Sequence, residues 1–508
     1  MNSSGGDFER GAPESGDAFR RAVGDTVEHA RTVIEDGPHD ATWDSLETHE
    51  AAPEWFRDAK FGVYCHWGLY SVPAFESEWY PRFMYDADHE IHDRRSLDND
   101  VFGHHVETYG PPDEAPYQDF AEDFTAENFD AETWADLFDE IGARFAGPVA
   151  EHHDGWSNWE SELNPWNAGD HGPHRDLVGA LETAVRDRGL RFMTSFHHER
   201  TRDHFQAAYE HYPSVMAEYP DEVMYGNLDD DLYFDYWLAR LVEVIDEYAP
   251  DLIWHDAGLE KIPESHHRQY LAYYFNRSIQ SDQEAVVTAK NEDLPLGVAV
   301  EDFERGRPAE QRDRPWLTDT SITTNGWAYL EDQSLKTPRT IVHELIDIVS
   351  KNGCLLLNFA PRPDGTIPES QKDVLRDVGA WLDTHGEAIY GTRPWTTFGE
   401  GPTNLDGGGH FLDDVEYTAA DVRYTRSKDA DTLYAIVMGW PADVTVNLDS
   451  VTIDDGADGD VGLLGGPDEL DYESDRENGL SITVPDLDAT ARPSDVAVVF
   501  KLAGFGVA

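Results

Sequence analysis

The chain has 508 residues, of which 40% are apolar and only 2 are cysteine. These values exclude a disordered chain, a collagen and a disulfide scaffold, and the length predicts two or three domains. Lys and Arg total 38 against 102 Asp and Glu, for a formal net charge of −64. Because nucleic acids and anionic membranes bind basic surfaces, we expect neither as a partner.

The acidity indicates the solvent in which the protein works. A charge of this size repels itself in dilute salt, whereas at molar salt the Debye length falls to about 3 Å and the repulsion is screened. Lysine supplies only 8 of the 38 cations, a usage typical of halophilic proteins. We therefore expect a salt-adapted protein whose acidity reflects its solvent and not its substrate.

The N-terminal sequence and the cysteines bear on location. No stretch approaches the roughly 18 apolar residues of a membrane helix, and no apolar run follows the pair Arg20-Arg21 as in an export signal. Cys65 and Cys354 lie in short apolar runs typical of buried strands, which fits a reducing compartment. We expect a cytoplasmic protein.

Residues 1–45 predict a polar N-terminal extension with a helical pattern over 18–35. From about residue 60 to 390, short apolar runs alternate with longer helical patterns, as in a parallel β/α architecture. The predicted strands are 61–68, 143–153, 190–198, 251–258, 284–290, 297–304 and 353–361. The predicted helices are 131–142, 175–189, 231–249, 338–353 and 368–391, the fourth starting at Pro338 and stopping at Gly353. Together they predict a (β/α)8-like barrel over residues 46–395.

The sequence beyond the barrel is β-rich. A turn-rich stretch at 398–410 precedes short β-branched runs separated by Gly, Asp and Pro. These runs are 415–427, 432–440, 443–453, 480–486 and 496–502. The pattern predicts a C-terminal antiparallel β-sandwich over residues 396–508.

Several predicted barrel strands end in ionisable residues. Because the carboxyl ends of barrel strands converge on one face, such residues can share a pocket although they are distant in sequence. Asp256 ends one strand, and the indole of Trp254, two residues earlier, should lie on the same side. Residues 301–304 supply further carboxylates at another strand end. Retaining hydrolysis of a glycoside needs two carboxylates about 5 to 5.5 Å apart, one as nucleophile and one as acid/base.

Ordered motifs between Trp55 and Trp395 carry a resemblance to a known family. They are WFRDAKFGVYCHWGLYSVPAFESEWY (55–80), AEHHDGWSNWESELNPWNAGDHGPHRDLVGAL (150–181), DLIWHDAG (251–258), NGWAYL (325–330), NGCLLLNFAPRPDGTIP (352–368) and GEAIYGTRPW (386–395). Together these motifs resemble the α-L-fucosidases of glycoside hydrolase family 29. The family's fold, a (β/α)8-like barrel followed by a β-sandwich, agrees with the organisation predicted above.

The resemblance implies a retaining exo-glycosidase that releases terminal α-L-fucose from a fucosylated oligosaccharide or glycoside, without cofactor or metal. Asp256 is then the nucleophile that forms a covalent glycosyl-aspartate. The positions implied to bind the sugar are His66, Glu78, Trp79, His152, His153, His197, Trp254 and Trp327. The resemblance leaves homo-oligomerisation open.

The acid/base departs from the commoner family pattern. Many relatives carry Trp-Glu-x-Cys late in the barrel, whereas here residues 316–319 read Trp-Leu-Thr-Asp and contain no glutamate. A subgroup with Asp-Phe-Glu-Arg-Gly is more similar, which implies Glu304 as the acid/base. Glu301 is the alternative, and Glu78 ranks third.

Two other functions compete with this interpretation. The pairs His152/His153 and His197/His198 could serve a metal-dependent hydrolase, but adjacent residues of a strand point to opposite faces, so each pair would offer one ligand. The 15 tryptophans could indicate a noncatalytic carbohydrate-binding protein. Asp256 argues against the second alternative because binding alone needs no carboxylate at the anomeric carbon.

Overall fold

Eight parallel strands close into a barrel in the computed structural model, which describes residues 11–95, 97–403, 405, 407–412, 415–451, 459–475 and 479–504. The strands are β1 (Phe61–Cys65), β2 (Phe145–Glu151), β3 (Arg191–Phe196), β4 (Leu252–His255), β5 (Val286–Ala289), β6 (Val300–Asp302), β7 (Trp316–Ser321) and β8 (Gly353–Phe359). β1 pairs with both β2 and β8, which closes the barrel. The predicted barrel is therefore confirmed.

Strand β7 was not among the predicted strands. Four of its six residues are Thr, Asp or Ser, so it lacks the apolar run by which the other seven were recognised, yet all six are buried. Their polar atoms find partners inside the protein: the Thr318 hydroxyl donates to the Gly306 carbonyl at 2.7 Å, and the Asp319 amide donates to Asp302 Oδ1 at 3.0 Å. A polar strand is stable here because neighbouring loops and strands supply its hydrogen bonds.

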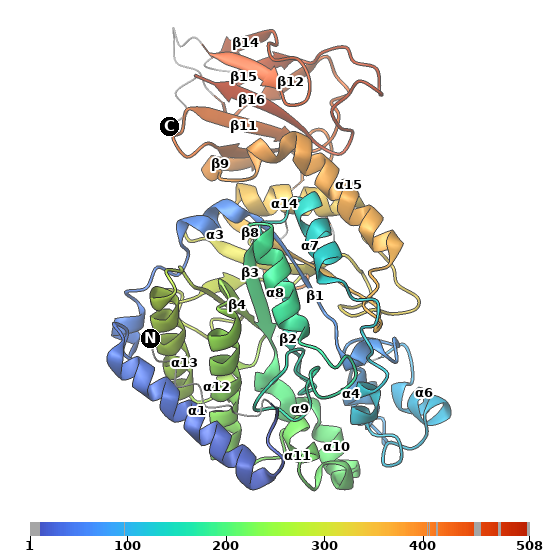
Figure 1. Cartoon of the computed structure of the whole chain (residues 1–508). Coiled ribbons are helices and arrows are strands. Elements are labelled where there is room, and N and C mark those ends of the chain that lie inside the picture. Colours follow the sequence, from blue (N-terminus) through green and yellow to red (C-terminus); the bar gives the residue numbers. More distant parts are fainter. Residues whose placement is uncertain are drawn as a thin grey trace.

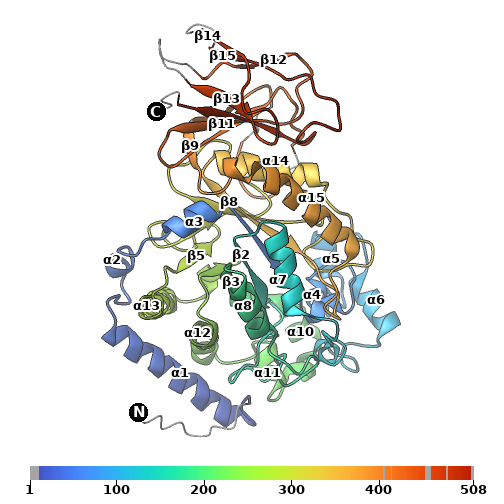
Figure 2. The ribbon, with the colours of Figure 1, turned by 45° about the horizontal axis from the view of Figure 1, so that its top comes forward.

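Long helices surround the barrel (Figures 1 and 2). They are α7 (Ala131–Glu140), α8 (Leu177–Asp187), α12 (Asp230–Tyr248), α13 (Glu264–Gln280), α14 (Pro338–Ser350) and α15 (Glu369–His385). Shorter helices precede the barrel or lie in its loops: α2 (Trp43–Leu46), α3 (Glu54–Ala59), α4 (Tyr80–Phe83), α5 (Glu90–Arg95), α6 (Val101–Thr108), α9 (Thr201–His204), α10 (Gln206–His211) and α11 (Asp221–Met224). Within the described residues, no helix is long and apolar enough to cross a membrane.

Helix α14 begins at Pro338 as predicted but ends before Gly353. Its last residue is Ser350, and Gly353 instead opens β8. A Cβ at Gly353 would lie 2.6 Å from side chains of both Ile348 and Trp316. The glycine is therefore explained by close packing at the start of a strand, and its prediction as a helix stop was wrong.

Helix α1 (Gly16–Asp36) realises the helical pattern of the N-terminal segment. Its apolar face is buried and packs against α12 and α13 (Figure 1). The Phe19 ring, for example, meets the Tyr236 ring of α12 edge-on at a centroid distance of 5.0 Å. The described part of the N-terminal segment thus belongs to the hydrophobic core outside the barrel strands.

The C-terminal region forms two antiparallel sheets, as predicted. One has the strand order β13-β16-β11-β10-β9 and the other β12-β15-β14. Their strands are β9 (Arg393–Glu400), β10 (Val422–Arg426), β11 (Thr432–Val437), β12 (Thr445–Leu448), β13 (Asp460–Leu463), β14 (Tyr472–Asp475), β15 (Gly479–Thr483) and β16 (Val498–Ala503). β9 and β10 lie against α14 (Figure 2). The domain limits at residues 45 and 395 stay predictions, and the second falls inside β9.

We expect Phe19→Ala to destabilise the protein although Phe19 lies in the N-terminal segment. The side chain is 1% exposed, and emptying such a site costs about 3 to 5 kcal/mol. Thermal unfolding at molar KCl should show a clearly lower midpoint for this variant than for the wild type. Glu28→Ala on the exposed face of the same helix is the control, and equal midpoints for both variants would contradict docking of α1.

Candidate active site

A cavity of about 640 Å³ opens at the carboxyl ends of the barrel strands. Every sequence-predicted site residue except Glu301 lines it: His66, Glu78, Trp79, His152, His153, His197, Trp254, Asp256, Glu304 and Trp327. The lining also includes residues that were not predicted, among them Arg200, Lys290, Arg305, Asp319, His410 and Phe411. The structure thus brings together side chains from strands spread across the barrel sequence.

Asp256 follows β4 directly and is held by its backbone amide, which donates to the Phe196 carbonyl at 3.1 Å. Its Oδ1 accepts a hydrogen bond from Lys290 Nζ at 3.0 Å. Its Oδ2 lies 3.3 Å from His153 Nε2 and 3.6 Å from His197 Nδ1. Burial opposes ionisation, but Lys290 and the two imidazoles hold the pKa of Asp256 well below its usual range. Asp256 is therefore a carboxylate.

Lys290 lies at the centre of four acidic groups. Besides Asp256, its ammonium donates to Glu304 Oε2 at 2.9 Å and lies 3.6 Å from Asp319 Oδ2 and 3.8 Å from Asp302 Oδ2. Burial disfavours the ammonium, but the surrounding acids, Asp319 and Glu304 foremost, raise the pKa of Lys290 well above its usual value. One positive charge cannot neutralise four negative ones, which favours protonation of Asp302 and Glu304.

Glu304 holds its proton more tightly than an ordinary glutamate. Burial raises its pKa to about 7, Asp319 and Asp256 add to the rise, and Lys290 opposes it. Burial and Asp319 likewise raise the pKa of Asp302 well above its usual value. The pKa values of Asp256 and Glu304 are thus shifted in opposite directions although both groups contact one ammonium.

The spacing of these two carboxyl groups follows from their shared partner. One oxygen of Asp256 and one of Glu304 lie 3.0 and 2.9 Å from the same nitrogen. The two oxygens are therefore within about 6 Å of each other, which is compatible with the roughly 5 to 5.5 Å between the carboxyl groups of retaining glycosidases. An ionised carboxylate and a second carboxyl group with a raised pKa can act as nucleophile and acid at such a spacing.

Glu301 lies outside the cavity. On β6 it alternates with Asp302, so the two side chains point to opposite faces of the strand. Asp302 faces Lys290, whereas Glu301 pairs with Arg312 at 3.0 Å. Of Glu304 and its nearest rival Glu301, only Glu304 lies beside Asp256.

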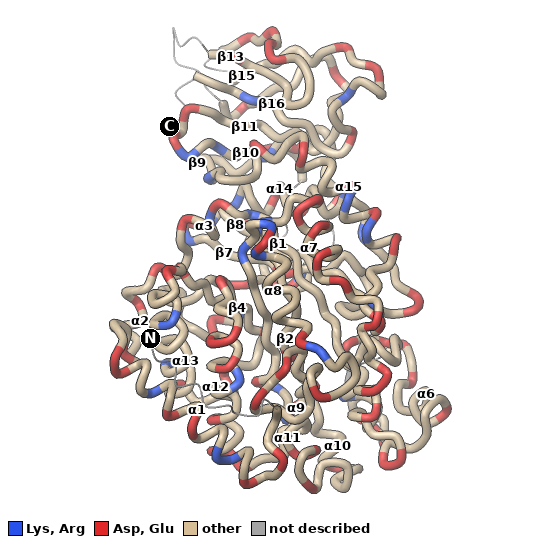
Figure 3. Tube along the Cα trace, viewed as in Figure 1, with Lys and Arg blue, Asp and Glu red and all other residues tan. Residues whose placement is uncertain are grey.

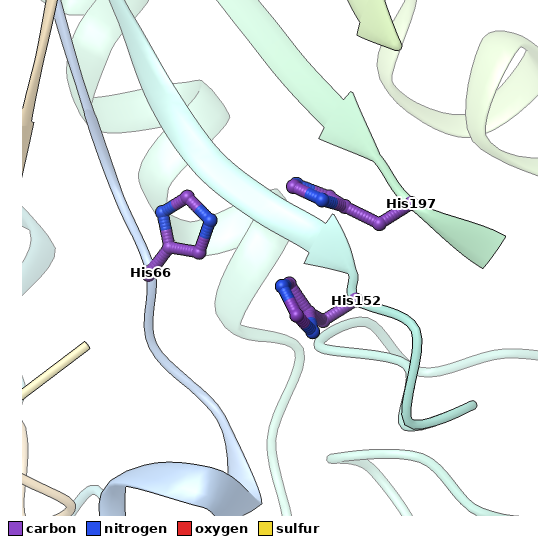
Figure 4. A group of neighbouring side chains, drawn as sticks. All are labelled: His66, His152 and His197. Carbon is purple, nitrogen blue, oxygen red and sulfur yellow. The ribbon is translucent and has the colours of Figure 1, made fainter. Parts of the chain in front are cut away.

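Three imidazoles of the cavity lining lie close together (Figure 4). His66, His152 and His197 follow β1, β2 and β3, and their nearest ring nitrogens lie within 4.8 Å of one another. Burial and neighbouring imidazoles lower the pKa of His66 and His152 far below the usual value, and burial lowers that of His197 to about 4. All three rings are neutral near pH 7, so each offers one donor and one acceptor.

A hydrogen bond to Asn358 orients the His66 ring and fixes which of its nitrogens is the acceptor. His66 Nδ1 donates to Asn358 Oδ1 at 2.9 Å, which leaves Nε2 as an acceptor. His152 Nδ1 and both ring nitrogens of His197 are buried with no hydrogen-bond partner among the described residues. Buried polar atoms of this kind need a ligand, and either sugar hydroxyls or a transition metal would satisfy them.

The two histidine pairs differ in how they present their side chains. We expected His152 and His153 to point to opposite faces of a strand, but both line the cavity. The expectation was wrong because β2 ends at Glu151, so the pair lies in a turn where strand alternation no longer applies. In the second pair only His197 lines the cavity, while His198 Nε2 lies 3.2 Å from the Trp237 carbonyl.

Indoles and a buried glutamate complete the wall of the cavity. Glu78 Oε2 accepts a hydrogen bond from the Trp327 amide at 3.1 Å, and burial raises the pKa of this glutamate. The ring centroids of Trp254 and His197 are 5.1 Å apart, and those of Trp79 and His153 are 5.0 Å apart. A pocket lined by apolar rings and by neutral donors and acceptors suits a small sugar with one apolar face.

Lys290 and His410 were missed by sequence reasoning for different reasons. Lys290 ends the predicted strand 284–290 just as Asp256 ends its own, so the rule that polar strand ends share a pocket could have found it. His410 follows three glycines more than a hundred residues after Glu304. Only the folded structure brings His410 to the cavity.

Comparison with known proteins places this site in a family. The Alpha-L-fucosidase family profile matches residues 26–387, and the Alpha-L-fucosidase C-terminal domain profile matches 415–503. Tissue alpha-L-fucosidase of Rattus norvegicus is 32% identical over 476 residues, covering 92% of this chain and 93% of that protein. The human tissue enzyme is 31% identical over 480 residues, covering 91% of each. The crystal structure of Thermotoga maritima alpha-fucosidase superimposes with a TM-score of 0.71 at 28% identity and covers 92% of this chain and 100% of that one. The chain belongs to the α-L-fucosidase family of glycoside hydrolases.

Proposed function

We propose that Asp256 and Glu304 are the nucleophile and the acid/base with which this glycoside hydrolase releases terminal α-L-fucose. The observation that carries the assignment is the pair of hydrogen bonds from Lys290 Nζ, 3.0 Å to Asp256 and 2.9 Å to Glu304. They hold the ionised Asp256 beside Glu304, whose pKa is raised to about 7. Family membership favours this chemistry over a metal-dependent hydrolase or a noncatalytic carbohydrate-binding protein.

The reaction takes two steps. An Asp256 oxygen attacks the anomeric carbon while the bond to the leaving group breaks, and Glu304 gives its proton to the departing oxygen. The product of this step is a fucosyl ester of Asp256 and an ionised Glu304. Water then attacks the same carbon, passes a proton to Glu304 and releases the Asp256 carboxylate, so the anomeric configuration is retained.

The remaining cavity residues bind the sugar in this proposal. The neutral imidazoles of His66, His152 and His197 accept from and donate to fucose hydroxyls, which satisfies their free nitrogens. Trp254 and Trp327 cover the apolar side with the methyl group, and Glu78, Trp79 and His153 complete the pocket. A fucosylated oligosaccharide or glycoside is the corresponding substrate.

We also propose that the protein is adapted to high salt. Asp and Glu are spread over both the barrel and the C-terminal sheets, with few Lys and Arg among them (Figure 3). The acidic residues of the described chain are thus not confined to one element, which favours a solvent role for the charge. Both cysteines are free and buried, which is compatible with the cytoplasmic location expected from the sequence.

Azide should distinguish the roles of the two carboxylates. We expect Asp256→Gly and Glu304→Ala each to lose at least about 100-fold in rate on an aryl α-L-fucoside with a poor leaving group. On a fucoside with a good leaving group, azide should restore both, but with opposite products by NMR. Asp256→Gly undergoes one inversion and gives β-fucosyl azide, whereas Glu304→Ala undergoes two and gives α-fucosyl azide.

Glu301→Ala is the matched control for this experiment. It should keep most of the wild-type rate, because its side chain pairs with Arg312 outside the cavity. Azide rescue of Glu301→Ala in place of Glu304→Ala would overturn the assignment of the acid.

The pH profile should show an alkaline limit set by Glu304. The acid must be protonated, and its pKa is about 7, so kcat/KM for an aryl fucoside should fall about tenfold for each pH unit above that value. Fucosyl fluoride is the control substrate because fluoride leaves without a proton, and its profile should stay flat there. An equal alkaline fall with both substrates would show that another group is responsible.

Dilution of salt should destabilise the protein. Lowering KCl from about 1 M to about 0.1 M lengthens the Debye length from about 3 to about 10 Å and restores repulsion within the charge of −64. The midpoint of thermal unfolding should therefore fall. Sucrose at the osmolality of 1 M KCl is the control, and an unchanged midpoint in dilute KCl would exclude salt adaptation.

A further inference from the structure

A segment from beyond the barrel completes the rim of the cavity. Residues 407–412 follow β9 in the chain, yet His410 and Phe411 line the cavity beside Glu304. These residues lie between the two regions matched by the family profiles, which end at 387 and resume at 415.

Backbone hydrogen bonds fasten this segment to the loop that carries Glu304. Arg307 and Gly409 exchange amide-to-carbonyl hydrogen bonds at 3.0 and 3.1 Å, as in an antiparallel bridge. The Phe411 amide donates to the Glu304 carbonyl at 2.8 Å. A Cβ on Gly306 would lie 1.9 Å from the Gly409 carbonyl oxygen, so only glycine permits this approach. Gly306 of the Glu304 loop thus permits the close approach of residues 407–412.

Phe411 is held in an unusual state for a large apolar residue. It is 66% exposed although it lines the cavity. Its φ of 52° lies in the left-handed region, which phenylalanine rarely adopts. Strained backbone of this kind is found at functional sites, and here it presents an apolar ring at the mouth of the cavity, where a bound molecule can stack on it.

His410 offers a polar group next to this ring. Its Nδ1 accepts a hydrogen bond from the Glu304 amide at 2.9 Å. In the neutral ring the proton must then be on Nε2, which becomes a donor. Burial lowers the pKa of His410 and favours this neutral form.

The position of Glu304 indicates which part of a substrate would lie against His410 and Phe411. An acid must be within hydrogen-bond reach of the oxygen it protonates, and that oxygen joins fucose to its leaving group. With fucose over Asp256 and the imidazoles, the leaving group lies on the Glu304 side. We propose that Phe411 is a specificity-determining platform on which the ring of the leaving group, a second pyranose or an aryl group, stacks, while His410 Nε2 donates to one of its hydroxyls. This inference rests on the proposed role of Glu304.

Three substrates separate a platform from other roles of Phe411. A fucosyl disaccharide has a ring in its leaving group and needs the acid, dinitrophenyl fucoside has a ring but needs little acid, and fucosyl fluoride has no ring and needs no acid. We expect Phe411→Ala to lower kcat/KM about tenfold on the first two, the equivalent of about 1.4 kcal/mol for an aromatic contact, and to leave the fluoride unchanged. Phe411→Tyr should keep the wild-type values.

The contrary outcomes are distinct. A loss confined to the disaccharide would make Phe411 a positioning residue for Glu304, and an equal loss on all three substrates would make it structural. No loss on any of the three substrates would also contradict stacking of the leaving group on Phe411. Val444→Ala, which removes an apolar side chain that is 78% exposed in the C-terminal region, controls for loss of exposed apolar surface. If instead the role of Glu304 is wrong, azide fails to rescue Glu304→Ala whatever Phe411 does.

Transfer of fucose to a sugar acceptor provides a second readout. The acceptor must occupy the place vacated by the leaving group, whereas water needs no platform. With fucosyl fluoride as donor, Phe411→Ala should lower the ratio of transfer to hydrolysis about tenfold at fixed acceptor concentration. An unchanged ratio would show that the acceptor ring does not contact Phe411.

Discussion

The ammonium of Lys290 among four acidic side chains is the interaction on which the site depends. Without a buried cation, Asp256, Asp302, Glu304 and Asp319 would repel one another and take up protons. With it, Asp256 stays ionised, because Lys290 and the imidazoles of His153 and His197 lower its pKa. Burial instead raises the pKa of Glu304 to about 7. The chain thereby obtains two carboxyl groups with well-separated pKa values around one shared partner, which is what the proposed acid and nucleophile require.

Much of this arrangement could be predicted from the sequence because barrel strands carry a strong local signal. Apolar runs that end in Asp256 or His66 predict both the strand and the face on which its last side chain lies. The signal fails where the interior itself is polar, as in β7, whose hydrogen-bond partners come from distant loops. It also fails where a strand ends early, because His152 and His153 both reach the cavity once the turn begins.

The pKa of Glu304 and the residues at the rim of the cavity could not be predicted from the sequence, for a different reason. The pKa of Glu304 depends on distances to Lys290 and Asp319, and neither spacing nor composition encodes such distances. His410 and Phe411 arrive from a glycine-rich segment whose local pattern predicts only a turn. Their partners in the Glu304 loop lie about a hundred residues earlier, so the match between Gly306 and Gly409 emerges only when both are folded.

The C-terminal sheets take part in the same construction through a second buried ion cluster. Asp347 of α14 contacts Arg307 at 3.0 Å and Arg423 of β10 at 2.6 Å, and Lys351 at 2.9 Å. Burial opposes its ionisation, but these three cations lower the pKa of Asp347 to about 2, so the cluster stays charged. Arg307 lies three residues after Glu304 and bridges to Gly409. Because buried charges are costly to separate, this cluster ties β10 and α14 to the loop that carries Glu304. The C-terminal region thus helps to hold the residue that we propose as the acid.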